Sequence, residues 1–219
     1  PVVAAAVGEV GGQLAGSAGN LAEHPAGKPA DGETVIADFT RGPDATRIIA
    51  DGAAWGRAAV AAGQPVLLPP ADGVPGRLRL EPFGHAHSDA VWSTTRSTGE
   101  RDSQPLGGVD RAGRVLRTPK VMIRDGVIWH RVRGHLQIFA VVDGHVLLQG
   151  GPIYGSHLLT VDTKGEWKWI RQDMTRDLAW DAGRLVHVEY AAVQGAGSVA
   201  EVVACGEQPV GVDPPAVAA

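Results

Sequence analysis

Tryptophan dominates the aromatic residues of this chain, which holds six Trp but only three Phe and two Tyr. A Trp ring is a large, rigid, apolar surface with one polar N–H group at its edge. Because sugars stack their C–H faces on such rings, the surplus predicts either a sugar platform or core packing. The aromatic candidates for a platform are Trp92, Trp129, Trp167, Trp169 and Tyr154.

Polar side chains alternate with apolar ones near the middle of the chain, at Arg131, Arg133, His135 and Gln137. If two strands pair across Gly134, these four side chains share one face of the sheet. The face then offers many hydrogen-bond donors to hydroxyl or carboxylate groups. An ordinary solvated sheet face is the other interpretation.

The segment 151–157 (GPIYGSH) follows as a loop that carries two further candidates. Tyr154 and His157 are expected to close over a ligand beside the arginine-bearing face. A plain hairpin loop with a packed tyrosine is the alternative.

The segment 84–89 (GHAHSD) places His85 and His87 two residues apart, a spacing that can ligate zinc. Metal-dependent hydrolases with this motif need a (β/α)₈ barrel, for which the chain lacks the helices. We therefore interpret it as a loop with incidental histidines. The Gly-x-Ser-x-Gly, His-Glu-x-x-His and phosphate-loop patterns are absent, and no carboxylate pair stands out for glycoside hydrolysis.

Short β-prone stretches recur at intervals of roughly ten residues, which is typical of a sandwich or barrel. Asp143-Gly144 between two such stretches predicts a tight hairpin turn. Pro119 has no N–H to donate and predicts an edge or a bulge. The expected strands are 35–39, 77–80, 90–95, 114–123, the hairpin strands within 127–149, then 158–162, 166–170, 185–190 and 198–205.

These elements predict an all-β fold, an antiparallel β-sandwich of jelly-roll or galactose-binding-like type, over residues 33–206. Residues 1–32 are rich in Ala and Gly and read as a linker or the tail of a preceding domain. Residues 207–219 read as a C-terminal linker. The segment as a whole is expected to be a piece of a larger protein.

Charge and cysteine content exclude several classes of function. The net charge is −4 with scattered Lys and Arg, which argues against nucleic acid as a partner. The sequence contains no window of about 20 apolar residues, so we expect no membrane span. Cys205 is the single cysteine, so no intrachain disulfide forms, and without a Cys-x-x-Cys-His motif no haem is expected in this chain.

Four segments recur in a recognisable order: 110–118 (DRAGRVLRT), 128–133, 139–146 and 167–173 (WKWIRQD). Thr118-Pro119 stands at the end of the first segment, Val142-Asp143-Gly144 forms a hairpin in the third, the fourth is a Trp-rich strand, and a last strand follows at 199–203. In this order the chain resembles the internal domain of large secreted planctomycete proteins that also carry cytochrome-c-like domains. Its strand order is also similar to sandwich modules attached to glycoside hydrolases. The resemblance implies an extracytoplasmic location, periplasmic or secreted.

Galactose-binding-like modules often hold a structural calcium between their first and last strands. The likeness therefore implies Asp38 and Glu201 as calcium ligands, since both carboxylates are hard oxygen donors. Solvated or salt-bridged acids are the alternative for these two residues.

The expected function is non-catalytic binding of a polysaccharide or oligosaccharide. The expected partners are a glycan and the neighbouring domains of the parent chain. The alternatives are a structural interdomain module without a free ligand, and a polysaccharide hydrolase or lyase. Exposed tryptophans in a groove would favour the glycan, and fully buried ones the structural module.

Overall fold

The part of the chain that the structure describes consists mainly of antiparallel β-strands, as the sequence predicts. The computed structural model describes residues 34–41, 49–50, 54–56, 60–68, 75–88, 115–122, 124–143, 155–176, 183–206 and 209. Within these ranges there is no α-helix, and the single helical turn is the 3₁₀ segment η1 (Gly155–His157). The described residues thus contain no helix that is long and apolar enough to cross a membrane.

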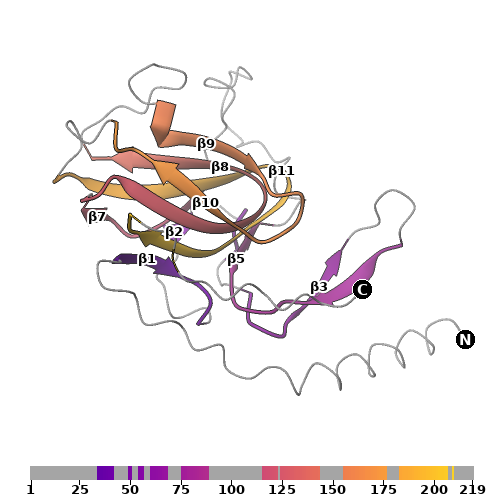
Figure 1. Cartoon of the computed structure of the whole chain (residues 1–219). Coiled ribbons are helices and arrows are strands. Elements are labelled where there is room, and N and C mark those ends of the chain that lie inside the picture. The colour runs from indigo at the N-terminus through magenta and orange to yellow at the C-terminus, as the bar shows by residue number, and fades with distance from the viewer. Residues whose placement is uncertain are drawn as a thin grey trace, which may run out of the picture.

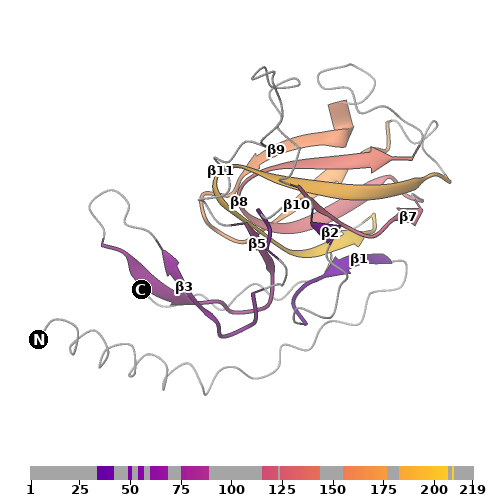
Figure 2. The same ribbon diagram turned by 180° about the vertical axis from the view of Figure 1, so that it is seen from behind.

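Nine strands form one curled sheet, and two more form a separate hairpin that projects away from it (Figures 1 and 2). The hairpin consists of β3 (Pro65–Leu68) and β4 (Arg77–Leu80). The curled sheet contains β1 (Thr34–Asp38), β2 (Ile49–Ala50), β5 (Ala86–Ser88), β6 (Val115–Arg117), β7 (Val121–Met122), β8 (Val127–Val142), β9 (Leu158–Asp162), β10 (Lys168–Asp173) and β11 (Leu185–Ala204).

The two longest strands, β8 and β11, pair with each other along most of their length. The other edge of β11 pairs in turn with β7, β6, β5 and β1, and the other edge of β8 pairs with β9 and β10. The sheet curls because both long strands bend, which Figure 1 shows. The expectation of two shorter strands at 185–190 and 198–205 is therefore wrong, since one strand covers both.

Gly134 lies inside β8 and does not end a strand, which corrects the predicted break there. Its φ is +100°, and a Cβ at this position would lie 2.3 Å from the Ala196 carbonyl oxygen in the facing strand. The Gly134 amide donates to Thr163 Oγ1 (2.8 Å), and the Thr163 amide donates back to the Gly134 carbonyl (3.1 Å). Glycine is needed here because the strand bends against its neighbour.

Other expected elements match the structure closely. The predicted strands at 77–80 and 158–162 are β4 and β9. The single strand expected over 114–123, with an edge or bulge at Pro119, is divided there into β6 and β7, and Pro119 lies in the gap between them. Asp143 is the first turn residue after β8, whereas Gly144 and the predicted strand at 90–95 lie outside the described residues.

The concave side of the curl holds the core. Even-numbered residues of β8 point into it on both sides of Gly134. They meet the inward side chains of β11, and the bend thereby folds one half of the sheet over the other. The fully buried contributors from these two strands include Val132, Leu136, Ile138, Val186, Val188, Tyr190, Val199 and Val202.

A buried polar chain links the two halves of the curl. Gln172 Nε2 donates to the Ser156 carbonyl (3.0 Å), which turns its Oε1 toward His130 Nε2 at 3.1 Å. His130 Nε2 must therefore carry the proton, and Nδ1 accepts from the Tyr190 hydroxyl at 2.7 Å. Burial lowers the pKa of His130 to about 3, so the ring is neutral at neutral pH.

Acid should destabilise the protein through this histidine. The unfolded chain protonates His130 near pH 6.5, while the folded protein resists protonation down to about pH 3. Below pH 6.5 the unfolded state binds more protons, so the free energy of unfolding should fall by up to about 1.4 kcal/mol per pH unit. Urea titrations from pH 7 to pH 4 should show this slope. In His130→Gln the slope should be smaller by about 1.4 kcal/mol per pH unit, which corresponds to one proton. His135→Gln, in the same strand but outside the core, is the matched control; an unchanged slope in His130→Gln contradicts the assignment.

Candidate functional site

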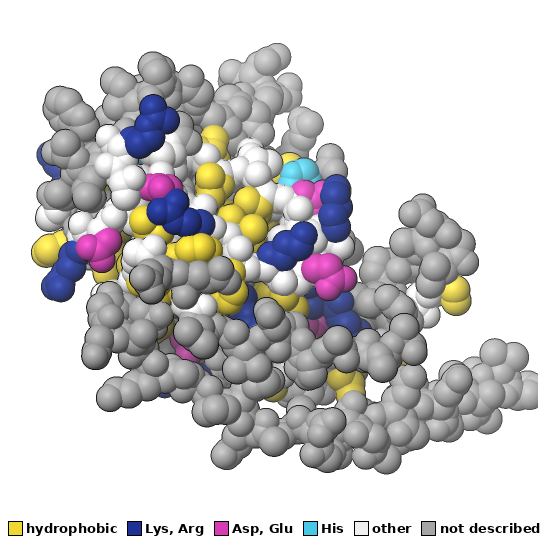
Figure 3. Space-filling model, viewed as in Figure 1, with side chains coloured by type: hydrophobic (Ala, Val, Ile, Leu, Met, Phe, Trp, Pro, Cys, Tyr) yellow, Lys and Arg dark blue, Asp and Glu magenta, His cyan; other side chains and the backbone are white. Residues whose placement is uncertain are grey.

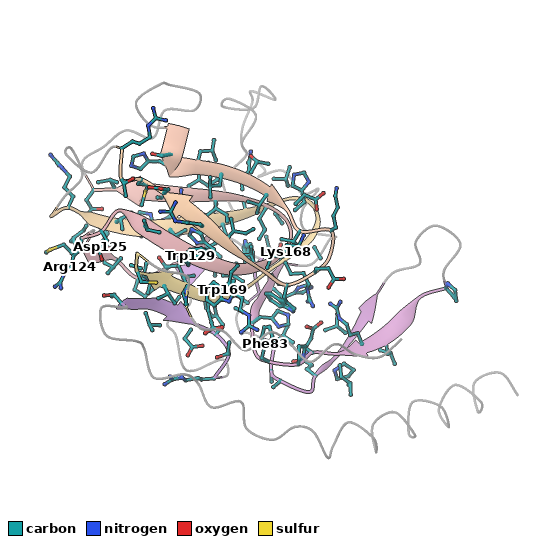
Figure 4. The ribbon with its side chains drawn as sticks, viewed as in Figure 1. Phe83, Arg124, Asp125, Trp129, Lys168 and Trp169 are labelled. Carbon is teal, nitrogen blue, oxygen red and sulfur yellow. The ribbon has the colours of Figure 1, made fainter. Side chains whose placement is uncertain are left out.

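On the convex face of the sheet, indole rings and guanidinium groups alternate along and across two neighbouring strands. Trp169 of β10 pairs with Arg131 of β8, and Arg171 of β10 pairs with Trp129 of β8. Directly opposed residues point to the same side of a sheet, so all four share this face, and the two rings are diagonal neighbours. Figure 4 shows Trp129 and Trp169 on this side, and Figure 3 shows apolar side chains there among charges of both signs. Both rings are half-buried.

Phe83 contacts this face from the segment before β5 and was not among the predicted site residues. The Arg131 Cζ atom lies 4.2 Å from the centre of the Phe83 ring and 5.9 Å from that of the Trp169 ring. The guanidinium thus makes cation–π contacts with two rings, which is favourable when the cation is shielded from water. Arg131 is only 7 % exposed, so it serves to fix the rings in place.

A second set of ring contacts extends the row beyond Phe83. Trp167 lies 4.9 Å from Phe83 between ring centres, and the Arg133 Cζ atom lies 4.6 Å from the centre of the Trp167 ring. The His85 ring meets Trp167 edge-on at 5.2 Å. We call Trp129, Trp169, Phe83 and Trp167, with Arg131 and Arg133, the aromatic face.

Gly84 allows the segment that carries Phe83 to lie against the end of β1. A Cβ at Gly84 would stand 2.4 Å from the Phe39 carbonyl oxygen and 3.0 Å from that of Thr40. Any larger residue would push this segment, and with it Phe83, away from the sheet.

Asp38 and Glu201 lie opposite each other in the pairing of β1 with β11. Each carboxylate already has a cation: Arg41 Nε lies 2.9 Å from Asp38 Oδ2, and Arg131 Nη1 lies 2.7 Å from Glu201 Oε2. Calcium seeks six to eight oxygen ligands, whereas guanidinium groups contact both acids here. The residues present therefore do not fit calcium and favour the salt-bridged alternative. Within the described ranges, no three His, Cys, Asp or Glu side chains gather as a metal-binding group.

Arg133 belongs to a buried charge cluster and is not a free donor. It donates to both oxygens of Glu81, from Nη1 at 2.9 Å and from Nη2 at 3.1 Å. Arg79 Nη2 also donates to Glu81, at 3.0 Å. Burial alone would raise the pKa of Glu81, but the bonds and charges of Arg133, together with His85 and Arg79, outweigh it and keep that pKa below its usual value. Glu81 is completely buried, so the pair orders this edge of the site.

His87 lies in a strand of the sheet and His85 forms an isolated β-bridge with Val60 directly before it, which corrects their interpretation as loop residues. His87 lies in β5, and its Nδ1 lies 2.9 Å from Ser198 Oγ. His85 Nδ1 donates to the Phe83 carbonyl at 3.2 Å, and burial lowers the pKa of His85 to about 4. The neutral Nε2 of His85 has no hydrogen-bond partner in the described part of the protein.

The remaining predicted site residues fall in several places. Trp92 and Tyr154 lie outside the described residues. His135 is half-buried on β8 beyond the Gly134 bend, opposite Asp162 of β9. His157 ends η1 and is 1 % exposed, so it is no surface loop residue. Of the predicted candidates, the structure brings Trp129, Arg131, Arg133, Trp167 and Trp169 together on one face.

A sequence signal for the missed residues does exist. Glu81, Phe83, His85 and His87 alternate with single residues in between, as side chains on one face of an extended segment do. Pro82 and Gly84 stand between them and give the segment the composition of a loop. Because of this loop-like composition, the alternation of these four residues was not recognised as that of an extended segment.

No family model, curated protein or solved structure that was compared with the chain matches it significantly. The aromatic face therefore has to be interpreted from its own chemistry. It offers half-exposed indole rings held by buried arginines, and it is bordered by charged groups that still reach solvent. Such a face can stack on a flat, apolar ring surface and exchange hydrogen bonds at its border.

Proposed function

We propose that the chain is a non-catalytic carbohydrate-binding module that uses the aromatic face to bind a polysaccharide or oligosaccharide. The observation that carries the proposal is the diagonal placement of Trp129 and Trp169 on one sheet face, each opposite an arginine. A sugar ring presents C–H groups on its faces and hydroxyl groups around its edge. An indole surface complements the first, and charged side chains complement the second.

The polar border of the face has both donors and acceptors within reach of solvent. Arg171 pairs with Asp173, and their side chains are 43 % and 38 % exposed. On the β11 side, Glu201 pairs with Arg131 and keeps 25 % of its side chain exposed. An exposed ion pair contributes little to stability, so Arg171 and Asp173 can exchange partners with sugar hydroxyls at small cost.

Contacts within the protein hold three of the rings in place. Arg131 contacts Phe83 and Trp169 together, and Phe83 contacts Trp167. Preorganised rings lose little conformational entropy on binding. Because sugar hydroxyls lose their bonds to water, the net affinity should still be weak, on the order of micromolar to millimolar.

The proposal extends to the setting of the module. We infer a β-sandwich of jelly-roll or galactose-binding-like type within a multidomain extracytoplasmic protein, similar to the planctomycete proteins that also carry cytochrome-c-like domains. The grounds are the antiparallel curled sheet and the sequence resemblance.

A structural interdomain module remains the second candidate, and one observation favours it. The indole N–H groups of Trp129, Trp167 and Trp169 are shielded from solvent and have no partner among the described residues. A buried donor without an acceptor costs about 1–3 kcal/mol. The N–H edges of these rings thus face the protein and not the solvent, as they do in rings whose role is packing.

Replacing Trp129 and Trp169 should distinguish the carbohydrate-binding module from the structural interdomain module. In native gels cast with β-glucan, galactomannan, xylan or alginate, we expect at least one polysaccharide to retard the intact chain. Trp169→Ala and Trp129→Ala should each weaken that retardation about tenfold, which corresponds to 1.4 kcal/mol of lost stacking. Leu78→Ala, which removes an exposed apolar residue from the separate hairpin, is the control.

Melting temperatures of the same variants complete the test. Weaker retardation with a nearly unchanged melting temperature supports the platform. Retardation of Trp129→Ala and Trp169→Ala equal to that of the unsubstituted chain rejects the aromatic face as the site.

A further inference from the structure

A pocket of about 220 Å³ opens at the end of the curled sheet where β1 and β7 lie. Ile128, Met174 and Val186 line it from the core, and each is at most 2 % exposed. Met122, Arg124 and Asp125 line it from the solvent side. None of its lining residues belongs to the aromatic face, so this site is separate from the proposed glycan site.

Methionine is concentrated in this pocket. The chain contains two methionines, and both Met122 and Met174 line it. The thioether side chain is flexible and polarisable, so it adapts to apolar guests of different shapes. The inner part of the pocket is therefore suited to a short aliphatic or aromatic group.

Three exposed apolar side chains belong to the strands that line this pocket or to the strand position next to a lining residue. Met122 is 50 % exposed, and its cross-strand partner Leu185 is 42 % exposed. Val35, which follows the lining residue Thr34, is 44 % exposed. Large apolar side chains that gather at the surface mark binding sites more often than isolated ones do.

Two opposite charges stand at this mouth. Arg124 and Asp125 are exposed neighbours in the bend before β8, and neither forms an ion pair with another described residue. Figure 4 shows both at this end of the sheet. A ligand with one charge would be attracted by one group and repelled by the other, whereas a zwitterion complements both.

We propose that this pocket binds a small zwitterion with an apolar tail, which is the chemistry of an apolar α-amino acid. The tail enters between Met174, Ile128 and Val186. The carboxylate faces Arg124 and the ammonium group faces Asp125. The inference is independent of the proposed glycan binding, because the two sites share no residue.

The two methionines provide the readout. Methyl-¹³C-methionine labelling of the full chain gives two methyl signals, one from the mouth of the pocket and one from its floor. We expect L-leucine at millimolar concentration to shift both signals in a saturable way. Leucine without its ammonium group (4-methylpentanoate) and leucine without its carboxylate (3-methylbutylamine) should each bind at least fivefold more weakly.

Exposed substitutions then assign the two charges. Arg124→Gln should abolish the preference for leucine over 3-methylbutylamine, and Asp125→Asn the preference over 4-methylpentanoate. Lys168→Gln removes an exposed charge outside the pocket lining and should change neither preference. No saturable shift of the Met174 signal, or equal affinities for the three compounds, would overturn the proposal.

Discussion

Gly134→Ala should destabilise the protein by about 3 kcal/mol or more. A Cβ at Gly134 would lie 2.3 Å from the Ala196 carbonyl oxygen, and the residue has a φ of +100°. The left-handed backbone alone costs a residue with a Cβ about 1–2 kcal/mol, and forced displacement of packed backbone costs a further 1–3 kcal/mol. Urea denaturation with a circular dichroism readout measures this loss.

Gly195→Ala is the matched control. Gly195 also has a positive φ, of +69°, but a Cβ there would have nothing within 4 Å. The free energy of unfolding of Gly195→Ala should therefore fall only by the cost of the left-handed backbone, about 1–2 kcal/mol. Equal losses in the two variants would show that the close approach of β8 to β11 at Gly134 does not shape the curl.

The second large effect concerns the buried ion pair. Glu81→Met should cost about 3–5 kcal/mol, because it leaves the Arg133 guanidinium buried without its bidentate partner. Arg133→Met should be similarly damaging, because Glu81 is completely buried. Thermal and urea unfolding of both variants at neutral pH test these values.

The double variant Glu81→Met/Arg133→Met decides how the cluster acts. Apolar residues of similar volume often replace a buried ion pair without loss of stability. The double variant should therefore be more stable than either single one, although Arg79 loses its contact with Glu81. Additive losses in the double-mutant cycle would mean that the two residues stabilise the fold independently.

The fold class and several strands could be predicted from the sequence because they depend on local patterns of residue type. β-Prone composition at regular spacing identified β4 and β9, and the missing N–H of Pro119 indicated an irregularity where the structure separates β6 from β7. The bend at Gly134 was misread because glycine has the same composition signal in a turn and in a curved strand. Only the facing strand, with Ala196 against Gly134, shows which of the two is present.

The burial of the two arginines depended on residues far along the chain. Arg133 meets Glu81 across 52 residues, and Arg131 meets Glu201 across 70. Alternation showed that both arginines share a sheet face, but it did not show that carboxylates and Phe83 cover that face. The aromatic part of the prediction was more robust, because Trp129 and Trp167 do lie on this face, together with Trp169.

The indole N–H signals of the intact chain test the proposed glycan site most directly. Six tryptophans give six ¹H–¹⁵N indole signals, which single Trp→Phe substitutions assign. During titration with the polysaccharides named above, the signals of Trp129 and Trp169 should shift, while that of Trp55, which is 1 % exposed in the core, should stay in place. If no polysaccharide moves the Trp129 and Trp169 signals at millimolar sugar concentration, the aromatic face is not a glycan site.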